Sequence, residues 1–240
     1  IRRNTEKADI ILFERGDYIS YANCGLPYYI GNVITERERL FVQTPEAFGK
    51  RFRVDVRTRS EVTEVNLQKK TVTVRTSDGD TYVEAYDKLL LSPGASPVRP
   101  PLPGIESEGI FTLRNVSDTD RIKTYMQQHA VKRAVIVGGG FIGLEMAENL
   151  HHAGAEVAVV EMADQVMGPV DYSMAALVHE HLLQKGVKLY LKQAVESFEP
   201  GRNGITVRFQ SGISLDADLV LLSIGVRPET SLAQKAGLKI

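Results

Sequence analysis

The sequence is short of sulfur and of long apolar runs. A single cysteine, Cys24, stands among its 240 residues, which excludes an intrachain disulfide. No stretch is apolar for long enough to cross a lipid bilayer, and the N-terminus shows no signal-peptide pattern. We therefore expect no membrane partner and a cytoplasmic location, in a compartment that keeps thiols reduced.

An excess of charge of one sign is also lacking. Lysine and arginine total 29, aspartate and glutamate total 30, and the formal net charge is −1. A nearly neutral chain gives no electrostatic basis for binding nucleic acid or an acidic membrane surface. The histidines and the cysteine show no zinc-binding spacing, so we expect no metal site. With 43% hydrophobic and 25% charged residues, the chain can form a real core in one large or two ordinary domains.

The middle of the chain has the pattern of a strand, a glycine turn, a helix and a second strand. The stretch is "RAVIVGGGFIGLEMAENLHHAGAEVAVVEMAD". The apolar run Ala134–Val137 predicts the first strand, and helical periodicity follows it until Gly154. The run Val157–Val160 predicts the second strand, which ends at Glu161.

Three glycines in this stretch form the pattern G-x-G-x-x-G. Gly138 permits a tight turn, Gly140 lets a pyrophosphate approach the backbone, and Gly143 lets the helix and the strand pack closely. The N-terminus of the helix then faces the phosphates. Glu161 follows Gly138 by 23 positions; its carboxylate can bind a ribose 2′-hydroxyl and repels a 2′-phosphate. The sequence therefore predicts a dinucleotide site that prefers NAD(H) to NADP(H).

The N-terminal residues repeat the end of this motif. The stretch "ADIILFERGD" matches "AEVAVVEMAD" in the character of each position, and Glu14 stands where Glu161 stands. The counterpart of the glycine turn would lie upstream of Ile1. We therefore expect two dinucleotide-binding units, the first of which lacks its opening strand and turn because the chain begins inside a domain.

Both halves continue with a strand-rich crossover and close with the matching stretches "LLLSPGASP" and "VLLSIGVRP". The fold class is therefore α/β, with two Rossmann-like units and antiparallel β crossovers. The proline-rich stretch 96–105 links the units. The expected elements are a helix over 173–185, a strand over 187–191, and turns at Asp78-Gly79, Asn203-Gly204 and Ser211-Gly212.

The first half carries an extra segment, which contains the cysteine. Gly94 follows Glu14 by 80 positions, whereas Gly225 follows Glu161 by 64; the excess lies mostly after Glu14 and includes 18–53. Within the excess, "YISYANCGLPYYIG" predicts a strand end, a glycine turn and a helix start. A thiol at a helix N-terminus is favoured as the thiolate, whereas the alternative for a lone cysteine is a small buried hydrophobe. Without a second cysteine, a redox cycle at Cys24 must use a sulfenic acid or a mixed disulfide.

Polar and basic residues near the cysteine have two interpretations. Ser20 and Asn23 either bind a ligand or form the turn. A group of basic residues is a candidate for binding a phosphorylated ligand, and for Lys50, Arg51 and Arg53 a solvated charged face is an equal alternative. The group consists of Arg2, Arg3, Lys50, Arg51 and Arg53.

Five motifs together resemble the flavin-type pyridine nucleotide–disulfide oxidoreductases. They are "FERGDYISYANCGLPYYIG", "YDKLLLSPGASP", "TLRNVSDTDRI", "VGGGFIGLEMAENL" and "SIGVRPET". Within this family the chain is similar to the single-cysteine branch: coenzyme A-disulfide reductases, NADH-dependent persulfide or polysulfide reductases, and NADH oxidases and peroxidases. The stretch "SYANCGLPY" favours the coenzyme A-disulfide and polysulfide group.

The resemblance implies a role for each matched position. Cys24 is the redox-active nucleophile beside the flavin, and Arg3, Ser20 and Asn23 bind coenzyme A. The fold is the three-layer ββα type that binds FAD or NAD(P), with a partial FAD-binding domain over 1–102, an NAD(P)H-binding domain over 103–226, and a return into the FAD domain over 227–240. The cofactor-binding positions are Glu14, Arg15, Ser92, Pro93 and Gly94 in the FAD domain, and Gly138, Gly140, Phe141, Ile142, Gly143, Glu145, Glu161 and Gly225 in the NAD(P)H domain.

The implied activity is electron transfer from NAD(P)H through FAD to Cys24, and onward to a small-molecule disulfide such as coenzyme A disulfide. The alternatives are a persulfide or polysulfide reductase, in which a rhodanese domain is often fused, and an NADH oxidase or peroxidase that uses a cysteine sulfenic acid. A non-catalytic nucleotide-binding module is the alternative outside enzymes. The resemblance further implies that the chain is part of a longer protein, which forms a homodimer through a C-terminal domain absent here.

Overall fold

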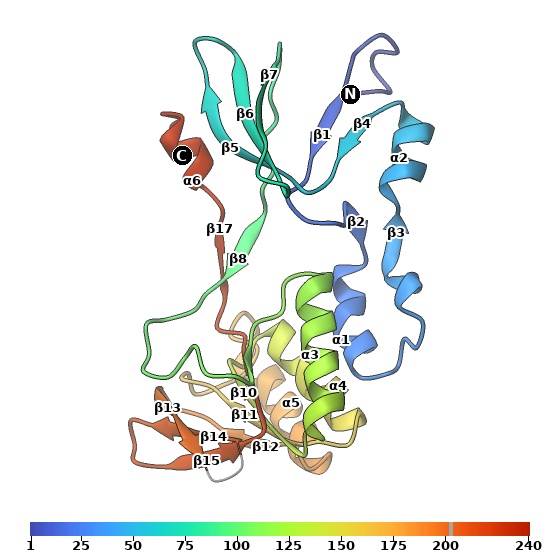
Figure 1. Cartoon of the computed structure of the whole chain (residues 1–240). Helices are drawn as coiled ribbons and strands as arrows, with labels where there is room; N and C mark the ends of the chain where they lie inside the picture. The colour runs from blue at the N-terminus through green and yellow to red at the C-terminus, as the bar shows by residue number, and fades with distance from the viewer. Residues whose placement is uncertain (202–203) are drawn as a thin grey trace. The chain divides into compact units, whose positions relative to one another are not determined.

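The computed structural model describes residues 1–201 and 204–240, so the turn predicted at Asn203-Gly204 lies partly outside the described residues. The chain has a mixed α/β fold and forms two compact units, which are described separately (Figure 1). The first unit comprises Ile1–Ala22, Glu38–Ala95 and Pro228–Ile240, and the second comprises Asn23–Arg37 and Ser96–Arg227.

The second unit contains a five-stranded parallel sheet with the order β12-β11-β10-β16-β9. Its central strands are runs of valine, isoleucine, leucine and alanine, which is typical of strands covered on both faces. Helices α4 and α5 pack on this sheet. The bounds are β9 (Ile110–Phe111), β10 (Arg133–Val137), β11 (Glu156–Val160), β12 (Lys188–Tyr190), β16 (Leu219–Leu222), α3 (Val116–His129), α4 (Phe141–His152) and α5 (Tyr172–Gln184).

A three-stranded antiparallel sheet forms a further layer of the second unit. Its apolar side chains, such as Phe198 and Val207, share one buried cluster with Val135, Val137 and Val220 of the parallel sheet. Helices, parallel sheet and antiparallel sheet thus form three layers, which confirms the predicted ββα architecture. The strands of the antiparallel layer are β13 (Val195–Gly201), β14 (Gly204–Phe209) and β15 (Ser214–Ala217), and the predicted turn at Ser211-Gly212 joins the last two.

The first unit has a parallel pair of strands, β1 with β4, and an antiparallel sheet of β5, β6 and β7. The predicted Asp78-Gly79 turn joins β6 to β7. Two short strands, β8 (Ala95–Pro97) and β17 (Val226–Pro228), contain points at which the chain passes from one unit to the other. The remaining bounds are β1 (Ile11–Phe13), β2 (Ser20–Tyr21), β3 (Phe41–Gln43), β4 (Asp55–Arg57), β5 (Ser60–Asn66), β6 (Thr71–Thr76), β7 (Thr81–Ala85), α2 (Pro45–Phe52), α6 (Ser231–Lys235) and the 3-10 helix η2 (Arg37–Leu40).

Matching backbone hydrogen bonds in the two units confirm the sequence repeat. Glu14 N donates to Arg57 O at 3.0 Å, and Glu161 N donates to Tyr190 O at 2.9 Å. The antiparallel sheets also have irregular registers at equivalent places, between residues 62 and 64 and between residues 195 and 197. Two further pairs match: Ser60 N to Glu14 O with Gln193 N to Glu161 O, and Arg59 N to Gly16 O with Lys192 N to Ala163 O.

One matched stretch has different structures in the two units. Leu219–Leu222 forms β16, which is buried between β10 and β9. Its counterpart, residues 89–91, forms no strand, and the Leu90 side chain is 79% exposed. The described part of the first unit holds no counterpart of β10 with which this apolar run could pair.

Candidate functional site

The glycine turn follows β10, at the point where the strand order of the sheet reverses. Gly138 has φ +109°, and a Cβ there would lie 2.5 Å from Ser223 O. A Cβ at Gly143 would lie 2.1 Å from Gly138 O, so the backbone of α4 contacts the turn directly. Side chains at these two positions would displace the turn, as the sequence predicted. Ser223, whose hydroxyl donates to Gly138 O at 2.9 Å, was not predicted from the sequence.

Gly140 differs from the other two glycines because it faces open space. It is the N-cap of α4, no side chain caps the helix there, and no atom lies within 4 Å of an added Cβ. The first turn of a helix leaves its backbone N–H groups available to a ligand, and its partial positive charge attracts anions. The next residues, Phe141 and Ile142, are exposed. This end of α4 fits the pyrophosphate of a dinucleotide.

Glu161 lies beside this turn at the end of β11. One carboxylate oxygen, Oε2, accepts from Gly139 N at 2.7 Å, and the other, Oε1, accepts from Ala163 N at 2.8 Å. The predicted acid is therefore next to the glycine turn, where the ribose of a dinucleotide would lie. Glu14 in the first unit shows the same local bond, because its Oε1 accepts from Gly16 N at 2.6 Å.

The loop that follows Glu161 is hydrogen-bonded to the glycine turn. Met167 N donates to Gly139 O at 2.8 Å, and Val166 is fully buried. Val166 N donates to Nε2 of His179, on α5, at 3.1 Å. No signal in the sequence identifies His179, because its contact with the loop comes from tertiary packing.

Cys24 lies in the 3-10 turn η1 (Asn23–Gly25), immediately before α1 (Leu26–Ile30). The residue is exposed, so the alternative of a buried hydrophobe was wrong. The predicted strand end, turn and helix start are confirmed. Cys24 and Asn23 belong to the second unit by their contacts.

Other predicted positions of the second unit lie near the same edge of its sheet. Glu145 is half-buried on α4. Gly225 follows β16, has φ +110°, and has no atom within 4 Å of an added Cβ. The structure thus brings the glycine turn, the start of α4 and Glu161 together, and it places Gly225 at the end of the strand beside β10.

The first unit holds the other predicted positions. Arg3 and Arg15 are exposed, and Ser20 lies on β2. Ser92, Pro93 and Gly94 are exposed, in a stretch without regular structure. Glu14 fits a ribose contact, but the described first unit has no counterpart of the glycine turn.

Two members of the basic group, Arg2 and Arg53, make contacts within the protein. The Arg2 guanidinium donates to Phe52 O at 2.9 Å and to Arg53 O at 2.6 Å, and Arg53 pairs with Glu6. Arg3, Lys50 and Arg51 are exposed.

Two negative findings apply to the part of the chain that the structure describes. No cluster of three or more His, Cys, Asp or Glu residues could hold a metal ion there. None of the helices described is long and apolar enough to cross a membrane.

Comparisons with known proteins give a consistent result. The family model of the pyridine nucleotide-disulphide oxidoreductases matches residues 1–240. A coenzyme A disulfide reductase of Staphylococcus haemolyticus is 35% identical over 241 residues, which cover 100% of this chain and 53% of the relative. The chain thus spans about half the length of the curated relatives that it matches.

Two solved structures share its fold. The structure of reduced Bacillus anthracis CoADR-RHD is 54% identical with a TM-score of 0.97, and the match covers 100% of this chain and 43% of that one. An NAD-dependent persulfide reductase from A. fulgidus is 37% identical with a TM-score of 0.94, covering 100% and 44%.

Proposed function

The chain belongs to the pyridine nucleotide-disulphide oxidoreductase family, and from this premise we propose that its protein reduces a low-molecular-weight disulfide, such as coenzyme A disulfide. The observation that carries the proposal is the exposed thiol of Cys24, in the 3-10 turn before α1. It is the only cysteine of the chain, so the reaction passes through a mixed disulfide with an outside thiol.

The cofactors in this proposal are FAD and NAD(H), which together supply a two-electron transfer to sulfur when they are bound. The turn that Gly138, Gly140 and Gly143 form binds the pyrophosphate of NAD(H), which approaches the backbone at Gly140, and the Glu161 carboxylate accepts hydrogen bonds from the ribose hydroxyls. The Glu161 carboxylate also repels a 2′-phosphate, so NAD(H) is preferred to NADP(H). In the first unit the FAD contacts are Glu14, Arg15, Ser92, Pro93 and Gly94.

Cys24 performs the sulfur chemistry of the cycle. Its thiolate attacks one sulfur of the substrate disulfide, a new S–S bond forms, and one substrate thiolate leaves and takes a proton. Two electrons from NADH then break the mixed disulfide, which returns the Cys24 thiolate and releases the second thiol. Each turnover consumes one NADH and one proton and yields two thiols. Arg3, Ser20 and Asn23 bind the coenzyme A part of the substrate.

A persulfide reductase is the second candidate. The similarity to the NAD-dependent persulfide reductase structure favours it. In that case the Cys24 thiolate attacks a sulfane sulfur instead of a disulfide. The dimer, the cytoplasmic location and a fused rhodanese domain stay predictions.

The test measures NADH consumption without oxygen, with coenzyme A disulfide as the only acceptor, and counts the thiols released. We expect two thiols per NADH and slower turnover with NADPH at the same concentration. The control replaces the disulfide by free coenzyme A, with which no NADH is consumed.

Turnover that starts only after polysulfide is supplied would contradict the disulfide proposal and favour the second candidate. Turnover only with oxygen or peroxide would assign the protein to the oxidase and peroxidase group, and would remove the coenzyme A roles of Arg3, Ser20 and Asn23.

A further inference from the structure

The segment that carries Cys24, residues 23–37, packs on the helices of the second unit. Its helix α1 contacts α3 and α4 (Figure 1). Leu26 and Ile30 of α1 are only 2% and 1% exposed. The cysteine-bearing segment therefore shares its core with the helix that begins at the glycine turn.

An ion pair holds the far end of the segment to α3. Arg37 Nε donates to Asp120 Oδ1 at 2.9 Å, and Arg37 Nη2 donates to Asp120 Oδ2 at 2.6 Å. The pair is bidentate: two guanidinium nitrogens each donate to a different oxygen of the carboxylate. This geometry fixes the relative orientation of the two side chains as well as their distance.

A lysine one turn further along α3 holds the middle of the segment. Lys123 Nζ donates to Tyr29 O at 2.6 Å and to Asn32 Oδ1 at 2.8 Å. The same ammonium lies 3.8 Å from the centroid of the Tyr29 ring. Burial lowers the pKa of Lys123 below its ordinary value. Asp120 and Lys123 are three residues apart, so they lie on one face of the helix.

The end of α1 also lies directly against α4. A Cβ at Gly31 would be 2.6 Å from Asn149 Oδ1 and 2.8 Å from Asn149 O. Asn149 is buried, and its side-chain amide donates to Glu145 O within α4 at 2.8 Å. The contact leaves no room for a side chain at Gly31, so it sets how closely the segment approaches α4.

We propose that Asp120 and Lys123 are positioning residues, which hold the Cys24 thiol in a fixed place relative to the glycine turn of α4. The proposal rests on the proposed function, because a thiol that takes electrons from a bound dinucleotide and flavin must be held in place. Lys123 meets the segment five residues after Cys24, at Tyr29, and Asp120 meets it thirteen residues after, at Arg37. The burial of apolar side chains does not by itself fix the orientation of α1, because the hydrophobic effect is non-directional. The hydrogen bonds from Lys123 and to Asp120 are directional and do fix it.

The test exchanges the two charges of the ion pair in the full protein. Arg37→Asp and Asp120→Arg each place like charges together, and the double variant restores an opposite pair. The first readout is the rate at which reduced Cys24 reacts with iodoacetamide, a neutral probe whose approach does not depend on charge. Because Cys24 is already exposed, the alkylation rate reports the orientation and surroundings of the thiol and not its uncovering. We expect the rate of each single variant to differ about two- to fivefold from wild type, and the double variant to recover at least half of the change.

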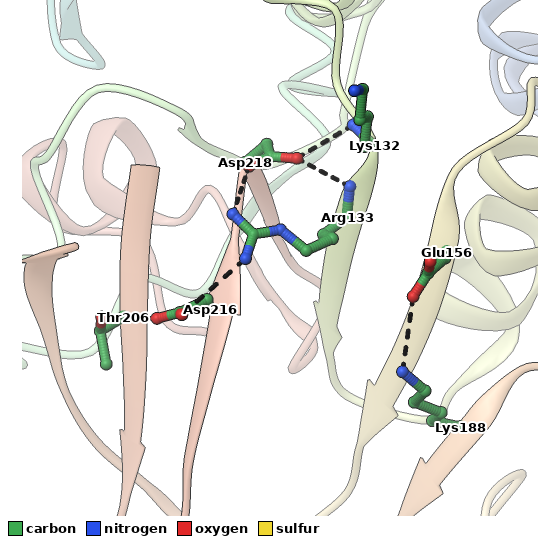
Figure 2. A network of polar contacts seen from close by, with 7 residues as sticks. All are labelled: Lys132, Arg133, Glu156, Lys188, Thr206, Asp216 and Asp218. Carbon is green, nitrogen blue, oxygen red and sulfur yellow. Dashed lines mark hydrogen bonds and ion pairs between the residues drawn. The ribbon is translucent and has the colours of Figure 1, made fainter. Parts of the chain in front are cut away.

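Lys123→Met removes the second contact and is expected to change the alkylation rate by a similar factor. Turnover with a disulfide should fall in all three single variants, while the Kd for NADH stays within twofold of wild type. The matched control reverses the exposed Lys188–Glu156 pair, which joins β12 to β11 of the same unit and includes no residue of the segment (Figure 2). It should leave the alkylation rate unchanged.

An unchanged alkylation rate in the single variants would overturn the proposal. A change in alkylation rate that the double variant does not reverse would overturn it as well. So would an alkylation rate that follows the unfolding temperature to the same extent in these variants and in the control. Alkylation needs no substrate, so this readout is independent of the disulfide activity. If the protein reduces no disulfide but the alkylation rates change as expected, the proposed substrate fails and the positioning role stands.

Discussion

At the scale of single residues, the three glycines of the turn serve different purposes because an added methyl group would meet different surroundings at each. At Gly143 it would meet the backbone oxygen of Gly138, 2.1 Å away. At Gly140 it would enter open space, in which the phosphates of a dinucleotide are expected. Within this one motif, Gly143 is therefore needed for folding and Gly140 for ligand binding.

Replacing these glycines by alanine should separate stability from binding. Gly143→Ala is expected to lower the free energy of unfolding by about 3 kcal/mol, because backbone has to move to admit the methyl group. Gly140→Ala should change stability by less than about 0.5 kcal/mol but weaken NADH binding at least about tenfold. Denaturant unfolding and NADH titration measure the two effects.

The control is Gly168→Ala, in the loop after Glu161, where an added Cβ also meets no atom within 4 Å. It should leave stability nearly unchanged and weaken NADH binding less than Gly140→Ala does. Equal NADH affinity in Gly140→Ala and wild type would show that the phosphates do not lie against this turn.

At the scale of elements, Asp218 ties together the beginnings of two parallel strands. Its Oδ2 accepts from the N–H groups of Lys132 and Arg133, at the start of β10, at 3.0 and 2.9 Å. Its Oδ1 accepts from the Arg133 guanidinium at 2.7 Å (Figure 2). Burial alone would raise the pKa of Asp218, but these hydrogen bonds outweigh it and lower the pKa below its ordinary value.

Asp218→Asn should therefore destabilise the second unit in a pH-dependent way. The folded-state pKa lies below the unfolded value of about 3.9, so the contribution is fully present above about pH 4 and is lost as pH falls through the folded-state pKa. At neutral pH we expect a loss of about 1–2 kcal/mol in the free energy of unfolding, and a smaller difference between variant and wild type in acid. Denaturant unfolding at several pH values measures both.

Asp216→Asn is the matched control on neighbouring β15. Its carboxylate lies 3.8 Å from the same arginine and is 60% exposed, so its removal should cost under about 1 kcal/mol. If the two variants lost equal stability at every pH, the account of Asp218 would be wrong.

The elements also show what sequence alone could predict. The strand, turn and helix around Gly138 were predicted because apolar runs, glycine spacing and helical periodicity are local signals. The absence of a strand at residues 89–91 was not predicted, because a strand also needs a neighbour, and pairing is not local. The attachment of residues 23–37 to α3 and α4 was missed for the same reason: Asp120 and Lys123 look like ordinary surface charges of a helix.

At the scale of the whole molecule, the chain contains one architectural pattern twice, with an insertion that carries the thiol. Equivalent hydrogen bonds at Glu14 and Glu161 mark the repeat, and Cys24 lies in the excess of the first half. Sequence comparison of the two halves predicted this plan. It could not predict that residues 23–37 of the insertion are compact with the second unit, because that depends on contacts between residues about 90 positions apart, such as Lys123 with Tyr29.

The central claim is that electrons leave the protein through Cys24, and Cys24→Ser tests it most directly. The full protein is purified with its flavin and mixed without oxygen first with NADH and then with coenzyme A disulfide. We expect the serine variant to lose flavin absorbance with NADH at the wild-type rate, because the dinucleotide site is untouched, but to release no thiol, because a serine hydroxyl cannot form the mixed disulfide. Release of two thiols per NADH at the wild-type rate from the serine variant would contradict the account.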